Sequence, residues 1–290
     1  MAMQGSVIYW SHEHRIHHRF TDKEEDPHSI KKGFLYAHVL WLFKKPKPID
    51  EMVVQDLTKN KLVRFQHSYY VPLAIATNLV AVIFVWWLTQ DLAGALIMSF
   101  LLRIFLLHHF TWFINSLAHT WGAKTYSGEQ TAVDNYIIAL VTFGEGYHNY
   151  HHVFASDYRN GIRWYHFDPS KWLVWILCKI GLVKDLKKMN QYTIKKTIIL
   201  EDKKILLEKI RESVYEQKEA LENKVHEMSE NLLTKLSHAN ILFHEYYKFK
   251  KIKDQKDAIR KQIKEFKLGV NESWKAWSRL TKDIMSLPNV

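Results

Sequence analysis

Two long apolar stretches constrain the fold more than any other feature of this sequence. Residues 71–88 carry no charged side chain, and their length is near the minimum for a helix that spans a bilayer. Residues 92–114 form a second such stretch, interrupted by Arg103 and a pair of histidines. Because only a short turn separates the two stretches, the sequence predicts a helical membrane hairpin that returns the chain to the side from which it entered.

Histidine motifs lie on both sides of this hairpin. The pattern His-x-x-His-His occurs at residues 14–18 and again at residues 148–152, and His119 follows the second apolar stretch. On a helix, this spacing places three imidazoles on one face. Neutral imidazole binds divalent iron, zinc or copper. We therefore predict a metal site at the end of the hairpin where both of its termini lie.

The number of histidines favours two ions, because it exceeds what one tetrahedral zinc ion binds. The zinc-protease pattern HExxH does not fit, since Ile16 stands where its second histidine would be. The predicted ligands are His14, His17, His18, His119, His148, His151 and His152. Structural or solvated roles are assigned to His12, His28, His38, His67, His166, His226, His238 and His244.

Charge and cysteine content restrict the partners and the compartment. The net charge is +11, and the segments that flank the hairpin are rich in lysine and arginine, whereas its connecting turn has neither. By the positive-inside rule, the histidines then face the cytosol. The single cysteine, Cys178, excludes an intrachain disulfide. Lysine and glutamate alternate in the C-terminal part, which favours a solvated helical surface over a nucleic-acid partner.

The remaining segments are expected to be helical. Residues 6–20 are typical of the end of a helix, and residues 30–45 indicate one helix lying in the membrane interface. After residue 191, apolar residues recur at intervals of three and four, as in a helical hairpin or coiled coil. The residues of this pattern are Leu221, Val225, Met228, Leu232 and Leu236.

The motifs at residues 14–18, 115–119 and 144–152 resemble those of membrane fatty acyl-CoA desaturases of the stearoyl-CoA (delta-9) type. The resemblance covers about residues 4–190. It implies an all-α integral membrane fold in which two irons activate dioxygen and a cis double bond is introduced into a long-chain fatty acyl-CoA. It also implies a one-electron donor of the cytochrome b5 or ferredoxin type.

The resemblance assigns further residues position by position. Asn115 matches a residue that holds an iron through water. Glu13 matches an acidic residue that contacts coenzyme A, and Lys44 and Lys45 match a basic pair that meets its phosphates. Lysines that extend from a helix end toward the membrane surface would explain that pair equally well. The positions that match the lining of the acyl tunnel are Gln4, Trp10, Thr111 and Trp112.

The sequence also departs from the family pattern. The first histidine box of the family, HxxxxH, lies upstream of the second, and this chain begins after it. We therefore expect residues 1–190 to be an N-terminally incomplete desaturase domain with two remaining transmembrane helices, inactive alone, and residues 191–290 to be a charged helical extension. Two alternatives remain: a histidine-box membrane hydroxylase, and a non-catalytic remnant with an interaction tail.

Overall fold

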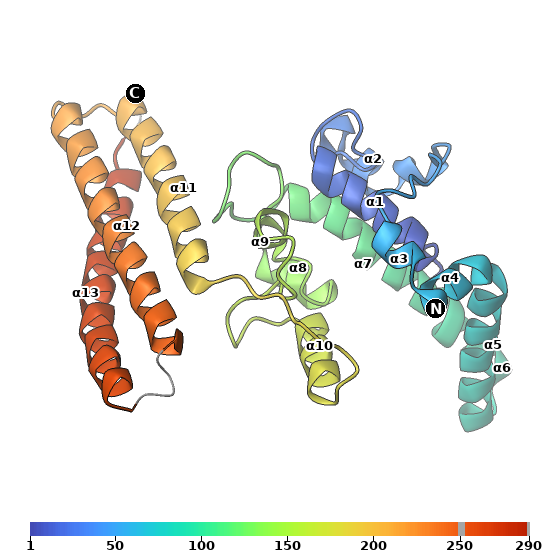
Figure 1. Cartoon of the computed structure of the whole chain (residues 1–290). Coiled ribbons are helices and arrows are strands. Elements are labelled where there is room, and N and C mark those ends of the chain that lie inside the picture. The colour runs from blue at the N-terminus through green and yellow to red at the C-terminus, as the bar shows by residue number, and fades with distance from the viewer. Residues whose placement is uncertain (249–252, 289–290) are drawn as a thin grey trace. The chain divides into compact units, whose positions relative to one another are not determined.

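The structure is a computed structural model and describes residues 1–248 and 253–288 (Figure 1). The chain divides into two compact units. The first consists of Met1–Lys124 and Glu129–Lys187, and the second of Thr125–Gly128 and Lys188–Val290. The described elements are helical, and extended pairing among the described residues is limited to two isolated bridges at Asp134.

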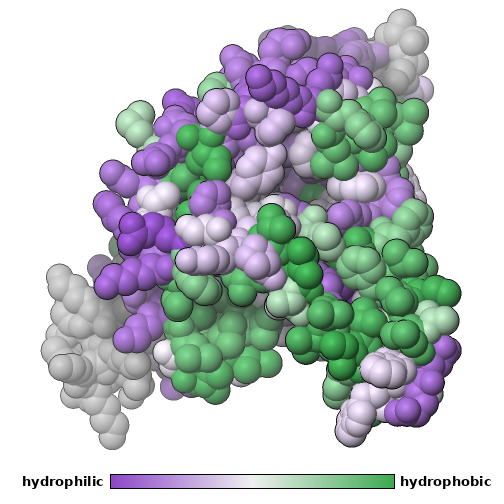
Figure 2. Space-filling model, turned by 90° about the vertical axis from the view of Figure 1, so that its right-hand side faces the viewer, coloured by the Kyte–Doolittle hydropathy of each residue, from purple (hydrophilic) through white to green (hydrophobic). Residues whose placement is uncertain are grey.

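The predicted membrane hairpin is present. Its first span is α5 (Tyr70–Thr89), and its second is a continuous helix over Leu92–His119; both are long and apolar enough to cross a membrane. Figure 2 faces the side on which α5 and α6 lie and shows hydrophobic residues gathered in its lower part. The parts of the second span are α6 (Leu92–Leu96), the π-helical η3 (Ile97–Leu102), α7 (Arg103–Ser116) and the 3-10 turn η4 (Leu117–His119).

The turn between the spans follows from two residues. Gln90 adopts the left-handed conformation, with φ of 55°, and its N–H donates to Trp86 O, which ends α5. Asp91 then caps α6, since its Oδ1 accepts from Gly94 N at 3.0 Å. Because this turn consists only of Gln90 and Asp91, the two spans stay adjacent.

The helix predicted over residues 6–20 is α1 (Val7–Phe20), but it begins there instead of continuing from an earlier helix. Ser6 is its N-cap, and Ser6 Oγ accepts from Tyr9 N at 3.1 Å. The other short helices of the first unit are α3 (Gln55–Thr58), α4 (Lys61–Ser68), α8 (Tyr136–Val141), α9 (His148–Val153) and α10 (Pro169–Lys179).

The single interfacial helix expected over residues 30–45 is wrong. The segment is broken into η1 (Ile30–Lys32), α2 (Phe34–His38) and η2 (Leu40–Phe43). The breaks lie at Gly33, whose φ is 105°, and at Val39, whose φ of −141° and ψ of −30° depart from helical values. At both residues the backbone leaves the α-helical conformation, which apolar composition alone does not reveal.

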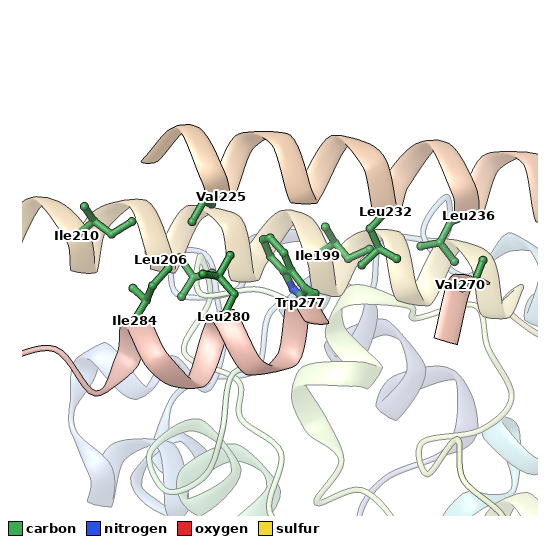
Figure 3. Packing of buried hydrophobic residues seen from close by; sticks show 10 residues of the cluster. All are labelled: Ile199, Leu206, Ile210, Val225, Leu232, Leu236, Val270, Trp277, Leu280 and Ile284. Carbon is green, nitrogen blue, oxygen red and sulfur yellow. The ribbon is translucent and has the colours of Figure 1, made fainter. Parts of the chain in front are cut away.

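The second unit is built from α11 (Gln191–Glu212), α12 (Lys218–Lys248) and α13 (Lys253–Met285). The expected helical hairpin is therefore a bundle of three helices. Figure 3 shows the side chains of its core pointing into the space between the helices, with Trp277 among them. Of the predicted apolar pattern, Val225, Leu232 and Leu236 belong to this core, and Leu221 and Met228 pack against it.

Candidate metal centre

Three elements supply the histidines: α1, the end of the second span at η4, and α9. The last of these is short, and its N-terminus is held by a residue distant in sequence, because Asp134 Oδ1 accepts from Tyr150 N at 3.1 Å. The preceding turn requires glycine. A Cβ on Gly146 would lie 2.1 Å from Ala139 N, and Gly144 has a φ of 106°. The close packing of Gly146 against the backbone of Ala139 fixes where α9 starts. It therefore sets the direction in which the histidines of α9 point.

The structure brings all seven predicted histidines together, in two groups. His17, His119, His148 and His152 form a buried group, and His14, His18 and His151 form a partly buried one. In each group the candidate ligand atoms lie within 4.8 Å of one another.

The spacing between neighbouring ring nitrogens fits shared coordination. In the buried group, Nε2 of His152 lies 3.3 Å from Nε2 of His17 and 3.1 Å from Nε2 of His148. In the other group, His151 Nε2 lies 3.2 Å from His14 Nε2 and 3.0 Å from His18 Nε2. Two nitrogens bound to one ion at about 2.0–2.1 Å, the zinc–histidine distance, are about 2.9–3.4 Å apart.

Hydrogen bonds to the opposite ring nitrogens show which tautomer these rings adopt. His17 Nδ1 lies 2.9 Å from Asp26 Oδ1, and a carboxylate can only accept. His119 Nδ1 lies 2.7 Å from Thr131 Oγ1, whose single proton is donated to Asp22 Oδ1 at 2.6 Å. In both rings the proton is therefore on Nδ1, and Nε2 directs a lone pair at its neighbours.

Burial keeps these imidazoles neutral. Burial and the neighbouring rings hold the pKa of His148 and of His152 well below 6.5. The same causes lower the pKa of His14 to about 2 and that of His18 to about 3. Neutral rings whose lone pairs face one another repel unless a cation lies between them, so the buried cluster fits a metal site.

Asp26 is the buried acid behind this cluster. Burial raises its pKa, but the hydrogen bond from His17 and the backbone N–H of Asp22 more than offset this, so the pKa lies below its usual value. A carboxylate that orients a ligating histidine and increases its basicity is a common feature of metal sites.

A cavity of about 390 Å³ adjoins the histidines. His14 and the predicted Asn115 line it together. Trp10 stacks on the His14 ring, with 4.7 Å between the ring centroids. The predicted substrate-contacting residues on its wall are Gln4, Trp10, Glu13, Thr111 and Trp112.

Lys44 and Lys45 line a second cavity, of about 310 Å³. Glu13 and Trp41 belong to the walls of both cavities. A pocket of mixed charge therefore adjoins the cavity next to the histidines. Its charged lining residues are Lys32, Lys44, Lys45, Lys47, Glu13, Glu24, Glu25 and Asp26. The structure places Lys44 and Lys45 on exposed backbone after η2 instead of at the end of a long helix.

The histidines that were given structural roles occupy varied positions. His28 is buried against the cluster, with its ring 5.2 Å from that of His17, and it also lines the larger cavity. His38 contacts His109 and Ser116, His67 contacts Ser6, and His166 stacks on Tyr147. His12 accepts from Asp50 N, His226 and His238 are exposed, and the side chain of His244 lies outside the described residues.

Sequence reasoning missed the residues behind the ligands. Asp22 and Thr131 are distant in sequence and carry no motif of their own. Asp26 follows the first triplet shortly in the sequence, and that position is the signal that could have identified it.

This combination of an apolar helical hairpin and histidine triplets that converge at one of its ends defines a class: integral membrane proteins with a histidine-ligated metal centre. Comparison with known families makes the assignment narrower. Residues 1–179 match the family described as fatty acid desaturase. The chain belongs to this family.

Relatives support the assignment. Acyl-CoA desaturase 1 of Saccharomyces cerevisiae is 40% identical over 206 residues, which are 70% of this chain and 40% of that protein. A probable acyl-CoA desaturase of Schizosaccharomyces pombe is 39% identical over 71% of this chain and 43% of its own length. Stearoyl-CoA desaturase 5 of Bos taurus is 32% identical over 67% of this chain and 60% of its own length. The chain thus spans about half the length of these relatives.

Proposed function

We propose that the protein acts in the dioxygen-dependent desaturation of a long-chain fatty acyl-CoA, introducing a cis double bond at the delta-9 position for the synthesis of unsaturated lipids. The observation that carries this proposal is the pairing of two histidine groups with an apolar-walled cavity, at one end of a membrane hairpin. The names of the similar proteins support acyl-CoA as the substrate class.

The two histidine groups would each hold one iron. His17, His119, His148 and His152 would bind one ion, and His14, His18 and His151 the other, with Asn115 near the second. Bound iron supplies the activation of dioxygen that removal of hydrogen from an unactivated methylene requires. Asp26 and Thr131 would hold His17 and His119 with Nε2 toward the ion.

The cavities would position the substrate. Trp10 and Trp112 offer apolar surface to an acyl chain, and the withdrawal of that chain from water would keep the reacting carbons dry. Lys44 and Lys45 would attract the phosphates of coenzyme A, because their ammonium groups favour an anionic head group. The acyl chain would then extend from the cavity that these two lysines line, past Glu13, toward His14.

The same proposal includes a membrane orientation and an electron donor. Lysine-rich flanks and the short Asp91 turn support a cytosolic position for the histidines. Electrons would then come from a cytosol-facing donor of the cytochrome b5 or ferredoxin type. The inactivity of this chain alone stays a prediction.

The test combines iron content with product analysis. The full chain is purified in detergent with ferrous iron, and we expect two bound irons per chain. His152→Ala should lose about one iron, whereas His226→Ala, a change at an exposed histidine, should keep both. A wild-type chain that binds no iron would refute the proposed centre.

Product analysis then separates desaturation from hydroxylation. A saturated acyl-CoA is supplied with an electron donor, and its products are resolved by mass spectrometry. Loss of two mass units through a cis double bond is the expected result. A gain of one oxygen would instead favour the hydroxylase. Iron without any product would agree with the predicted inactivity of the chain alone.

A further inference from the structure

The C-terminal bundle contains a cavity that has no part in the proposed reaction. Its volume is about 580 Å³, and its lining residues come from α11 with its N-cap, α12 and α13. Pockets of this size between the helices of a bundle commonly bind small molecules. The described residues that line it all belong to the second unit, and they lie outside residues 1–179, which match the desaturase family.

One wall of the cavity continues the apolar core. Leu236 and Val270, which are 4% and 5% exposed, belong to the core cluster and also line the cavity (Figure 3). Ala239 and Phe243 follow Leu236 on α12 at intervals of three and four residues, so they extend the same face of the helix. Contact with this wall would withdraw the hydrocarbon part of a ligand from water.

Two lysines line the same cavity, one on α11 and one on α13. Lys195 Nζ lies 5.3 Å from the centroid of the Trp274 ring, and Lys267 Nζ lies 5.1 Å from that of Phe243. An aromatic face attracts an ammonium group without cancelling its charge. Within the described part of the chain neither lysine forms an ion pair. No acidic side chain is among the described residues that line the cavity, so its charge is positive.

The surroundings of Lys195 add to the preference for an anion. Withdrawal from water lowers the pKa of its ammonium group, and a bound anion would offset that loss of hydration. The first turn of α11 borders the same cavity, with Asn190 as its N-cap, and Tyr192 N donates to Asn190 Oδ1 at 3.0 Å. The positive end of the dipole of this helix therefore acts in the same direction as the two lysines.

Side-chain amides supply neutral hydrogen bonds beside these charges. Asn190 Nδ2 donates to Asn240 Oδ1 at 2.9 Å, which connects the start of α11 to α12. The NH₂ group of Asn240 then remains as a donor, and Asn271 brings a further amide from α13. Donors of this kind can bind the oxygens of a head group that the lysines do not reach.

We propose that this cavity binds a small amphipathic anion, with its apolar body against Leu236, Ala239 and Phe243 and its carboxylate or phosphate held by Lys195 and Lys267. A neutral apolar molecule would leave the two ammonium groups without a counter-charge. A hydrophilic anion would leave the apolar wall in contact with water. The inference goes beyond the proposed function and does not depend on it.

The experiment is a titration of the full chain, in nanodiscs of zwitterionic lipid, followed by the methyl NMR signals of Leu236 and Val270. Octanoate and octyl phosphate carry the same chain with different head groups, and at least one of them should shift both signals saturably. Val225 lies in the same core but does not line the cavity, so its signal should stay constant. Octanol, which lacks the charge, and acetate, which lacks the chain, should each bind about 10-fold more weakly or less.

Substitution of the lysines tests the head-group site. The double variant Lys195→Met and Lys267→Met keeps apolar length and should weaken binding of the anionic probe by about 10-fold, without changing binding of octanol. Lys195→Arg keeps the charge and should bind like the wild type. Lys196→Met, at the exposed neighbour of Lys195 on α11, is the matched control. Thermal unfolding of each variant verifies that the bundle is intact.

Four results would overturn the inference. The first is the absence of a saturable shift with both anionic probes. The second is equal binding of octanol, which would make the cavity apolar only, and the third is equal binding of acetate, which would mean that charge alone is recognised. The fourth is unchanged affinity in the double methionine variant, which would place the head group elsewhere. Binding by the anionic probe that is lost in this variant and kept in Lys195→Arg supports the inference.

Discussion

The two units of the molecule fill their interiors in opposite ways. The core of the C-terminal bundle is apolar, from Ile210 and Ile284 at one end of the cluster to Leu236 and Val270 at the other (Figure 3). The interior around the histidines is polar, and its most buried side chains include His148 and Asn149, each 1% exposed. One unit is stabilised by the removal of hydrocarbon from water. The other buries nitrogen lone pairs that a cation would satisfy.

This difference shows that burial alone does not reveal what stabilises a region. A neutral imidazole that is withdrawn from water with its lone pair unsatisfied raises the free energy of the folded state. An isoleucine in the same degree of burial lowers it. The metal-free histidine unit should therefore be sensitive to acid, ligands and single polar changes, whereas the bundle should respond mainly to changes of packing.

Acid should produce the largest difference in stability between the two units. Burial lowers the pKa of His14 to about 2, that of His18 to about 3 and that of His151 to about 4, whereas in the unfolded chain all three lie near 6.5. The folded state therefore binds fewer protons, and its stability decreases as the pH falls below about 6.5 and continues to decrease toward the folded pKa values.

The measurement is unfolding of the metal-free chain between pH 7 and pH 4, followed by the assigned NMR signals of His148 and His152 for the first unit and of the Trp277 indole N–H for the second. Loss of both signals at one pH would contradict the comparison.

A cavity in the bundle should have the next largest effect. Trp277 is 1% exposed, and its Nε1 donates to Asp202 Oδ2 at 3.0 Å. Trp277→Ala should cost about 3–5 kcal/mol, typical of a buried tryptophan. Thermal unfolding by circular dichroism checks this, with Co²⁺ binding as the second readout. If metal binding falls with bundle stability, the units are not independent.

Loss of a single buried carboxylate in the first unit should act by weakening metal binding. Asp26→Asn removes the charge that orients His17 and should weaken one Co²⁺ binding event by about 10–100-fold. Competition with a chelator of known affinity measures the change. Asp283→Asn, an exposed change in α13, is the control and should leave the affinity unaltered. An equal loss in both variants would show that the effect is one of net charge.

The smallest effect is expected at the surface of the bundle. Lys203 Nζ lies 3.1 Å from Glu230 Oε1, and Glu230 is largely exposed. Lys203→Gln should change stability by less than about 1 kcal/mol, and the effect should vanish at high salt. Thermal unfolding at two salt concentrations tests this. A loss comparable with that of Trp277→Ala would mean that charge pairing, not the apolar core, holds the bundle together.

The features that could be predicted from the sequence are those that depend on a local pattern of residues. The spans, the seven histidines and the apolar spacing on α12 are each readable within a few turns of helix. The residues that orient the ligands could not be predicted in this way, because Asp22 meets Thr131 only through the tertiary fold. The break at Val39 was missed because its cause is a backbone conformation rather than a composition.

The π-helical segment Ile97–Leu102 has a consequence for how insertions and deletions act on this protein. A π-turn holds one residue more than an α-turn, and each residue of an α-helix advances the helix by about 100°. Deletion of one residue there would let the segment close into regular α-helix with little rotation of the residues that follow. Deletion of one residue from the α-helical part between Arg103 and Ile114 would instead rotate Asn115 and His119 by about 100° away from the other histidines. The span would remain equally apolar and almost equally long. Hydropathy would not distinguish the two deletions, and yet only the second would change the direction in which the histidine end of the span faces.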